Sequence, residues 1–307
     1  MTATPSRLPT VPEGVLRAVE QRYDLGTVEL REPLAGGVAN DVAVVESAAG
    51  SLVLRLKFPP SDPASISWEH DLVARLAGEL PEVVAPLRAR DGSTFFLWAG
   101  DAVWLVPYVE ALPATPDCEQ HRLAAARLLG RLHAVTAKLG LAPRPHAEGI
   151  AQLRSLDARA LPPKWRRRVV RLHGEALNLL ARLERRRPTA GVLHGDFFRG
   201  NVLVRDDRVV ALIDWEEAHV GPLVFELANG MWEFTKSETA HDFDRAAGRR
   251  FVDAYRAAGG SVPPDEENLI VPLIRAKRVL ELLRSPTDRS VDWDYQEHNL
   301  RAAETLA

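Results

Sequence analysis

The chain contains 307 residues with a mass of 33.9 kDa, 39 basic and 42 acidic side chains, and a formal net charge of −3. At about 150 residues per domain, this length indicates two domains or one domain with two lobes. A hydrophobic fraction of 46% and a charged fraction of 26% exclude a disordered or fibrous chain. The near balance of charges gives no general reason to expect nucleic acid or an anionic membrane as a partner.

Cysteine and lysine are both scarce. The single cysteine, Cys118, excludes an internal disulfide framework and a multi-cysteine zinc site, so we expect a cytoplasmic protein. Residues 1–16 lack the pattern of a secretory signal, and no apolar run approaches the roughly 18 residues that span a bilayer. Only five of the 39 basic residues are lysine, and Lys57 and Lys138 are the two in the first half of the chain.

The first hundred residues are predicted to be mainly sheet with one inserted helix. Alternating apolar residues in the run 52–58, ended by Pro59 and Pro60, predict a strand. The other predicted elements here are a helix at 15–23, a short strand before residue 34, strands at 42–46, 94–97 and 102–106, and a helix at 67–76.

Helical spacing dominates after Pro107. Within 119–139, for example, Leu128, Leu132, Val135 and Leu139 share one helix face. Further helices are predicted at 165–183, 222–234, 242–258, 269–283 and 294–306, with short strands at 202–204 and 209–213. We therefore predict an α+β fold with a small, sheet-rich lobe at 1–106 and a larger, mainly helical lobe at 107–307.

The segment from His194 to Asn201, with the sequence HGDFFRGN, carries the clearest chemistry. Asp196 follows a glycine at the end of the apolar run Val192–Leu193, which places a carboxylate on a loop at a strand end. Aspartate and asparagine are also common turn formers and helix caps, so neither residue alone defines a site.

A hairpin is predicted directly after this loop. With Asp206 and Asp207 as its two turn residues, the register places Asn201 opposite Leu212, and Asp214 lies two residues, about 7 Å, further along. An amide oxygen and a carboxylate oxygen then converge at the mouth of the hairpin. Such hard oxygen donors suit Mg²⁺ that keeps water and phosphate oxygens as its other ligands. The ordered combination with Asp196 favours a metal-plus-base site over three unrelated turn residues.

The pattern H-G-D-x-x-x-x-N followed by I-D-W at 213–215 resembles the aminoglycoside phosphotransferase/choline kinase-like family, relatives of the protein kinases. The resemblance extends from the loop at Leu34 to the last helix. It implies a bilobal protein-kinase-like fold with a small antiparallel-sheet N-lobe that binds ATP and a mainly helical C-lobe. It further implies that Asp196 orients the substrate hydroxyl and accepts its proton, and that Asn201 and Asp214 bind Mg²⁺.

The resemblance also implies a cation on the third strand that binds the nucleotide phosphates and pairs with a glutamate of the next helix. The candidates are Arg55 and Lys57, which strand alternation puts on the same face of the sheet. Composition favours Lys57, the only lysine of this lobe, whereas the run LVLR at 52–55 and the helix with Glu69 match the family pattern with Arg55. Because a guanidinium can bridge a carboxylate and a phosphate, we predict Arg55 paired with Glu69; the alternative is a surface ion pair.

Two further nucleotide contacts are implied by the resemblance. The turn at 34–41, with Gly36 and Gly37, looks like the nucleotide-covering turn of the family, although paired glycines occur in many hairpins. Val106 and Tyr108 lie where the family has its hinge, so backbone groups there are expected to read the adenine. The alternative for Tyr108 is a packed aromatic residue.

The chain departs from the family pattern in one helix. A D-x-A motif is replaced by Glu226-Leu-Ala228, so the family's bond from this helix to the catalytic loop is expected to be rearranged by one additional methylene. This departure marks a distinct subgroup. His194 is expected to brace the same loop rather than to take the proton.

Aromatic and acidic residues are neighbours in three segments that are candidates for the acceptor site: WEE at 215–217, WE at 232–233 and DWD at 292–294. Such pairs can hold a cationic amine through charge and cation–π contact, and helix packing with solvated acids is the alternative. The family implies acceptors such as aminoglycosides, amino sugars, sugars or amino alcohols, and the fold alone does not select among them.

The sequence therefore predicts a Mg²⁺-dependent kinase that transfers the γ-phosphoryl group of ATP to a hydroxyl of a small molecule. A catalytically silent, nucleotide-binding scaffold with the same fold is the alternative, and the presence of Asp196, Asn201 and Asp214 argues against it. A nucleic-acid-binding protein is a more distant alternative, because the arginine runs at 166–168 and 185–187 are better explained as solvated helix surface.

Overall fold

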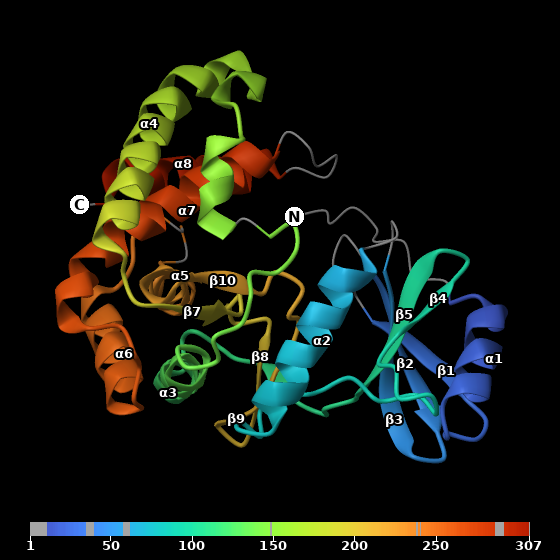
Figure 1. Cartoon of the computed structure of the whole chain (residues 1–307). Coiled ribbons are helices and arrows are strands. Elements are labelled where there is room, and N and C mark those ends of the chain that lie inside the picture. The colour runs from blue at the N-terminus through green and yellow to red at the C-terminus, as the bar shows by residue number, and fades with distance from the viewer. Residues whose placement is uncertain are drawn as a thin grey trace. The chain divides into compact units, whose positions relative to one another are not determined.

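The structure is a computed structural model that describes residues 11–34, 40–57, 62–147, 149–237, 239, 241–285 and 292–306. The chain divides into two compact units, Met1–Glu110 and Ala111–Ala307. Figure 1 shows the helices and strands of each unit.

The first unit is built on a five-stranded antiparallel sheet with the strand order β1-β2-β3-β5-β4. Its elements are α1 (Glu13–Arg22), β1 (Glu29–Leu34), β2 (Asn40–Ser47), β3 (Gly50–Lys57), α2 (Pro63–Ala77), β4 (Phe96–Trp98) and β5 (Asp101–Pro107). The predicted sheet with one inserted helix is confirmed, and α1 is the additional helix expected before it.

The two faces of this sheet are covered by different helices. Leu54 and Leu56 of β3 share a hydrophobic cluster with Val15 and Val19 of α1. Ile66 of α2 instead packs with Trp104 and Ala102 of β5, and these two residues are opposite Arg55 and Lys57 of β3 in the strand register. Strand alternation therefore places both cations on the α2 side of the sheet, as predicted.

The second unit is mainly helical and contains two small antiparallel sheets, β6-β8-β9 and β7-β10. Its strands are β6 (Leu112–Pro113), β7 (Ala190–Leu193), β8 (Val202–Arg205), β9 (Arg208–Leu212) and β10 (His219–Pro222). Its helices are α3 (Glu119–Thr136), α4 (Pro163–Arg186), α5 (Leu223–Thr235), α6 (Arg245–Ala257), α7 (Ile270–Arg284) and α8 (Trp293–Thr305). Three short 3₁₀ helices are η1 (Gly149–Arg154), η2 (Ala158–Ala160) and η3 (Pro264–Leu269).

Helix α5 forms the centre of the second unit. Every one of its residues is buried, and it contacts α3, α6 and α7 (Figure 1). A helix that is apolar on all sides needs such an environment. Two acidic residues, Glu226 and Glu233, are buried with it and need polar partners.

The hairpin β8–β9 corrects one detail of the predicted register. The turn at Asp206 and Asp207 is present, with positive φ at both residues as a two-residue hairpin requires. The register shifts between Leu203 and Val204, however, so that Val202 and not Asn201 is opposite Leu212. A β-bulge, with one more residue on β9, causes this shift.

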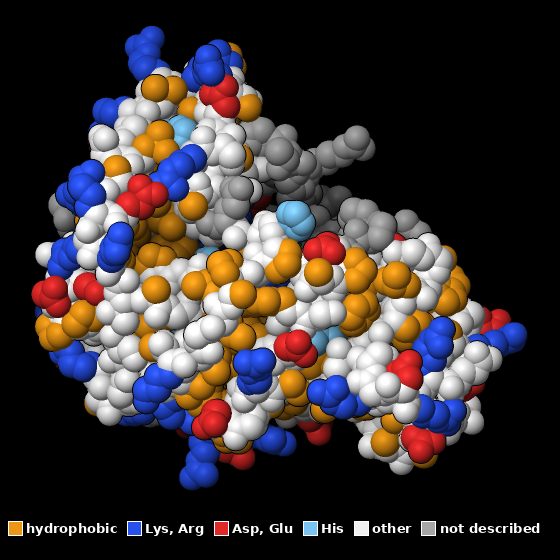
Figure 2. Space-filling model, in the orientation of Figure 1, with side chains coloured by type: hydrophobic (Ala, Val, Ile, Leu, Met, Phe, Trp, Pro, Cys, Tyr) orange, Lys and Arg blue, Asp and Glu red, His pale blue; other side chains and the backbone are white. Residues whose placement is uncertain are grey.

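The surface of the molecule carries mixed charge. On the face in Figure 2, basic side chains are spread singly, with acidic side chains between them. Most residues of the arginine runs 166–168 and 185–187 are exposed on or beside α4, as expected for solvated helix surface. Among the described residues, no helix has both the length and the apolar character needed to cross a membrane.

Candidate active site

Two loops of the second unit meet because their strands are paired. The segment 194–201 follows β7, the segment 213–218 precedes β10, and Leu193 is opposite His219 in the β7–β10 ladder. We call these segments the paired loops. Their backbones approach so closely that a Cβ atom at Gly195, which has a φ of +87°, would overlap the carbonyl oxygen of Glu217.

Two hydrogen bonds join the paired loops. The amide of Ile213 donates to the carbonyl of Asn201 at 3.0 Å, and His194 Nε2 donates to the carbonyl of Ile213 at 2.9 Å. The His194 ring is fully buried against the Trp215 ring, with 4.5 Å between centroids. His194 therefore braces the loops, in the position expected from the sequence.

Asp196 and Asn201 are in direct contact. Asn201 Nδ2 donates to both the backbone carbonyl and the Oδ2 atom of Asp196, at 3.0 Å each. This fixes the orientation of the amide, and no described residue donates a hydrogen bond to its Oδ1 atom. The neutral Asn201 oxygen is therefore available as a hard ligand, and Asp214 follows Ile213, the residue hydrogen-bonded to Asn201.

Asp214 and Asp196 both show signs of a constrained environment. Asp214 has a φ of +68°, a left-handed conformation that is uncommon for a residue with a side chain. Burial raises the pKa of the Asp196 carboxyl, the charges of Asp214 and Glu217 act in the same direction, and Lys277 opposes them. A carboxylate with a raised pKa binds a proton more readily than an exposed one.

Glu226 of α5 holds the start of the segment 194–201. Its Oε2 accepts from the amide of His194 at 3.0 Å and its Oε1 from the amide of Gly195 at 2.7 Å. His133 Nε2 also donates to Oε2 at 3.0 Å. Burial opposes the charge of Glu226, but these hydrogen bonds and the nearby histidines hold the pKa of its carboxyl below its usual range. The glutamate of α5 thus reaches both amides at the start of this segment.

The second of the paired loops is held by Arg144, from the connection after α3. Its Nη1 donates to the carbonyls of Trp215, Glu216 and Ala218 at 3.3, 2.6 and 3.2 Å. Arg144 is only 6% exposed, and the loop it holds begins directly after Asp214. The Trp215 carbonyl also accepts from the Ala218 amide at 3.0 Å, and Arg144 adds a side-chain donor that stabilises this backbone.

The predicted nucleotide contacts lie in the first unit. The Arg55 guanidinium lies 5.5 Å from the Trp104 ring centroid, and Glu69 of α2 is buried. Val106 pairs with Val53 in the β3–β5 ladder, and the Tyr108 amide donates to the carbonyl of Ser51 at 3.2 Å. The pairing of Arg55 with Glu69 stays a prediction.

The predicted covering turn cannot be compared with the structure. Gly36 and Gly37 lie outside the described residues.

The three aromatic–acidic segments do not present aromatic rings to a ligand. Trp215 and Trp232 are 4% and 1% exposed, and the Trp293 ring packs against the Trp165 ring at 5.5 Å. For these rings, the packing alternative is what the structure supports. The acidic residues of the three segments lie in different places and differ widely in exposure. They are Glu217, Glu233 and Asp292, which caps α8.

Sequence reasoning missed three residues around this site. Arg144 lies in a loop without a motif, His133 looks like one polar residue in an amphipathic helix, and Lys277 belongs to a helix 63 positions after Asp214. The one signal that could have pointed to Lys277 was composition, because lysine is rare in this chain.

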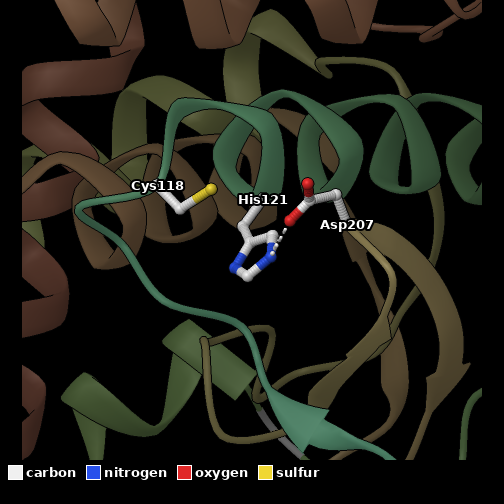
Figure 3. Close-up of side chains that lie close together, drawn as sticks. All are labelled: Cys118, His121 and Asp207. Carbon is white, nitrogen blue, oxygen red and sulfur yellow. Dashed lines mark hydrogen bonds and ion pairs between the residues drawn. The ribbon is translucent and has the colours of Figure 1, made fainter.

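A cluster of Cys118, His121 and Asp207 lies elsewhere in the second unit (Figure 3). Its ligand atoms lie within 4.8 Å of one another, which is close enough for a metal ion. His121 Nδ1, however, accepts from the amide of Thr115 at 3.0 Å, and Nε2 contacts Asp207 Oδ1 at 3.1 Å. The proton is therefore on Nε2, and the free lone pair needed by a metal already faces an N–H group.

Comparisons with known proteins identify the family of this chain. The model of the phosphotransferase enzyme family matches residues 31–269. A homoserine kinase of Methylobacterium nodulans is 28% identical over 288 residues, covering 92% of this chain and 87% of that protein. A homoserine kinase of Pseudomonas aeruginosa is 29% identical over 244 residues, covering 78% of this chain and 75% of that protein.

Solved structures show the same fold at lower sequence identity. The amicoumacin kinase hAmiN, solved with AMP-PNP, Ca²⁺ and Ami, has a TM-score of 0.75 at 16% identity, covering 96% of this chain and 92% of that one. A microcompartment-associated aminopropanol kinase has a TM-score of 0.73 at 18% identity, covering 94% of each chain.

The sheet unit and the helical unit together have the kinase-like fold of these solved structures. This chain belongs to the phosphotransferase enzyme family. It is an ATP-dependent small-molecule kinase that acts on a hydroxyl group, and the resemblance seen in the HGD…N…IDW pattern is confirmed.

Proposed function

We propose that this kinase is Mg²⁺-dependent and phosphorylates a small, amine-bearing alcohol, with homoserine as the first candidate. The contact of Asn201 with Asp196, next to the backbone bond from Ile213, is the observation that carries the catalytic part of the proposal. The relatives named homoserine kinase, which align over most of this chain, support the acceptor.

Asn201 and Asp214 fit a magnesium ion. Both offer oxygen donors, the Asn201 amide is oriented with its nitrogen already occupied, and Asp214 follows the residue that bonds to Asn201. Bound there, Mg²⁺ would neutralise charge on the transferring phosphoryl group.

Asp196 is the proposed catalytic residue. Asn201 holds its Oδ2 atom, and no described residue bonds to Oδ1, which can accept from the acceptor hydroxyl. As the hydroxyl oxygen bonds to the γ-phosphorus, the bond from phosphorus to the ADP oxygen breaks and the hydroxyl proton passes to Asp196. Most of the rate enhancement then comes from positioning and electrostatic stabilisation.

In the first unit, we propose that Arg55, held by Glu69, binds the nucleotide phosphates. The guanidinium and α2 lie on the same side of the sheet, and a buried glutamate needs a cationic or hydrogen-bonding partner. Lys57 remains the alternative cation, since it shares this face. We propose the turn with Gly36 and Gly37 as the cover of the nucleotide, and the strand end near Val106 and Tyr108 as its adenine-binding edge.

An acceptor panel tests the proposal. Wild-type protein with Mg-ATP is incubated with L-homoserine, 3-amino-1-propanol, amino sugars and an aminoglycoside, and ADP release is followed together with ³¹P spectra of the product. We expect L-homoserine to be phosphorylated fastest, and Asp196→Asn to lower kcat by about 10³-fold, within the range typical of general-base removal. The proposed function would be refuted if no acceptor were phosphorylated, or if Asp196→Asn transferred phosphate as fast as the wild type. ATP binding without any phosphoryl transfer would favour the scaffold alternative.

A further inference from the structure

One face of α7 borders the paired loops. Lys277, Glu281 and Arg284 follow at intervals of four and three residues, so they share this face, and we call them the α7 charged face. Arg284 is paired with Glu217 at 3.7 Å, and the backbone of Glu217 packs on Gly195, beside Asp196. Helix α7 also contacts α5 and α8 within the same unit (Figure 1).

Lys277 is an unusual member of this face. Its side chain is only 12% exposed, yet its ammonium makes no hydrogen bond to any described residue, and its ion pair with Glu281 spans 3.7 Å. By contrast, Lys236, at the end of α5, bonds to Glu233 at 2.6 Å. An ammonium without a close acceptor keeps all three of its N–H groups for an anion that binds beside it.

Glu281 does not neutralise Lys277 alone, because it is shared with Arg278. Arg278 is 1% exposed and lies 3.2 Å from Glu281, with Asn229 and Glu233 as further partners. The two carboxylates and the buried Arg278 form an ion-paired group, to which Lys277 adds a positive charge. That charge lies on the helix face whose Arg284 is paired with Glu217, and the backbone of Glu217 packs on Gly195, beside Asp196.

We propose that Lys277 binds a carboxylate of the acceptor, so that the substrate class is an alcohol that carries a carboxylate, such as a hydroxy amino acid. This inference rests on the proposed function and narrows it: aminoglycosides and plain amino alcohols lack the group that Lys277 binds. An ordinary pair at positions i and i+4 on a helix surface has two exposed side chains, whereas the Lys277 side chain is only 12% exposed.

Four acceptors that differ in their carboxylate show how much this group contributes to kcat/KM. L-homoserine and 4-hydroxybutanoate carry it, L-homoserine amide has it neutralised, and 3-amino-1-propanol lacks it. We expect wild-type kcat/KM to be at least tenfold higher for L-homoserine than for the amide or 3-amino-1-propanol. Lys277→Met is expected to lower kcat/KM for the two carboxylates about 10- to 100-fold, the worth of one charge-assisted hydrogen bond, and to change the other two less than threefold.

Controls separate binding from folding and from turnover. Lys277→Arg should restore most of the preference, and Lys164→Met, at an exposed position on α4, should leave all four values unchanged. Calorimetric titration of L-homoserine without ATP should show weaker binding to Lys277→Met than to the wild type.

The outcomes are distinct. Phosphorylation of the carboxylate-free acceptors as efficiently as of L-homoserine overturns the inference and leaves the kinase function intact. Equal losses on all four acceptors in Lys277→Met also overturn it, because they indicate a structural role. Failure to phosphorylate any acceptor overturns the inference together with the proposed function.

Discussion

The paired loops and the α7 charged face lie beside each other but differ in how their polar groups are satisfied. In and beneath the loops, His194, Asn201 and Glu226 of α5 each bond to backbone or side-chain partners at about 3 Å. On the α7 charged face, the Lys277 ammonium has only one distant ion pair. A network in which every polar group has a partner fixes the geometry of the loops. A charged group without a close partner can still bind a ligand of opposite charge.

This difference suggests a division of labour. In the proposed function, the paired loops hold the groups for phosphoryl transfer. The α7 charged face belongs to a distant part of the chain, and a change there can alter the acceptor without disturbing the loops. Substitutions that remove hydrogen bonds of the paired loops should therefore lower stability and kcat. Substitutions on the α7 charged face should instead weaken acceptor binding.

Glu226→Gln is expected to have the largest effect on the loops. An amide cannot accept from the His194 amide, the Gly195 amide and His133 at once, and it brings a donor toward backbone N–H groups. We expect a loss of about 1–3 kcal/mol in the free energy of unfolding and a fall in kcat of at least tenfold. Urea unfolding and steady-state kinetics measure both, and an unchanged kcat would show that the network does not position the loop.

The same variant has a pH signature. Because the pKa of Glu226 is lowered on folding, its ionised form stabilises the protein above the unfolded value of 4.5, and this contribution is lost as the pH falls through the lower, folded value. The stability difference between wild type and Glu226→Gln should therefore be constant above about pH 5 and shrink on acidification.

Arg144→Met is expected to have an intermediate effect. It removes the side-chain donor that the carbonyls of Trp215, Glu216 and Ala218 share, and it loosens the segment after Asp214. We expect the Mg²⁺ concentration for half-maximal activity to rise several-fold, and the Mg²⁺-dependent gain in melting temperature with ADP to shrink. Arg154→Met, which removes an exposed arginine paired with Glu184, is the matched control and should change neither. If the two variants have the same Mg²⁺ dependence and the same gain in melting temperature, Arg144 does not position Asp214.

Arg284→Met is expected to have the smallest effect. Its ion pair with Glu217 spans 3.7 Å between side chains that are 35% and 59% exposed, and such pairs contribute little. We expect kcat/KM for L-homoserine to change less than threefold. A loss as large as that of Lys277→Met would assign carboxylate binding to the whole α7 charged face rather than to Lys277.

Much of the site could be predicted from sequence because its residues are close along the chain. The spacing of Asp196 and Asn201 and the hairpin turn at Asp206–Asp207 are local, and the structure places Asp196 and Asn201 in contact. The strand register was wrong by one residue, because a bulge on β9 depends on packing that the turn sequence does not encode.

The supporting residues could not be predicted in this way. Arg144 bonds to a segment more than 70 positions away, and His133 meets Glu226 from 93 positions away, so only the tertiary fold brings them together. For the aromatic–acidic pairs, the sequence instead suggested a site where the structure has core. Trp215 and Trp232 are neighbours of acidic residues in sequence, but their rings are buried.

One kinetic comparison tests the central claim most directly: steady-state kinetics of Asp196→Asn and Lys277→Met with L-homoserine and saturating Mg-ATP. We expect Asp196→Asn to lose about 10³-fold in kcat with KM for L-homoserine nearly unchanged, and Lys277→Met to raise that KM at least tenfold with kcat nearly unchanged. If both variants lower kcat and leave KM alone, or if Asp196→Asn retains activity, then the division between the paired loops and the α7 charged face is wrong.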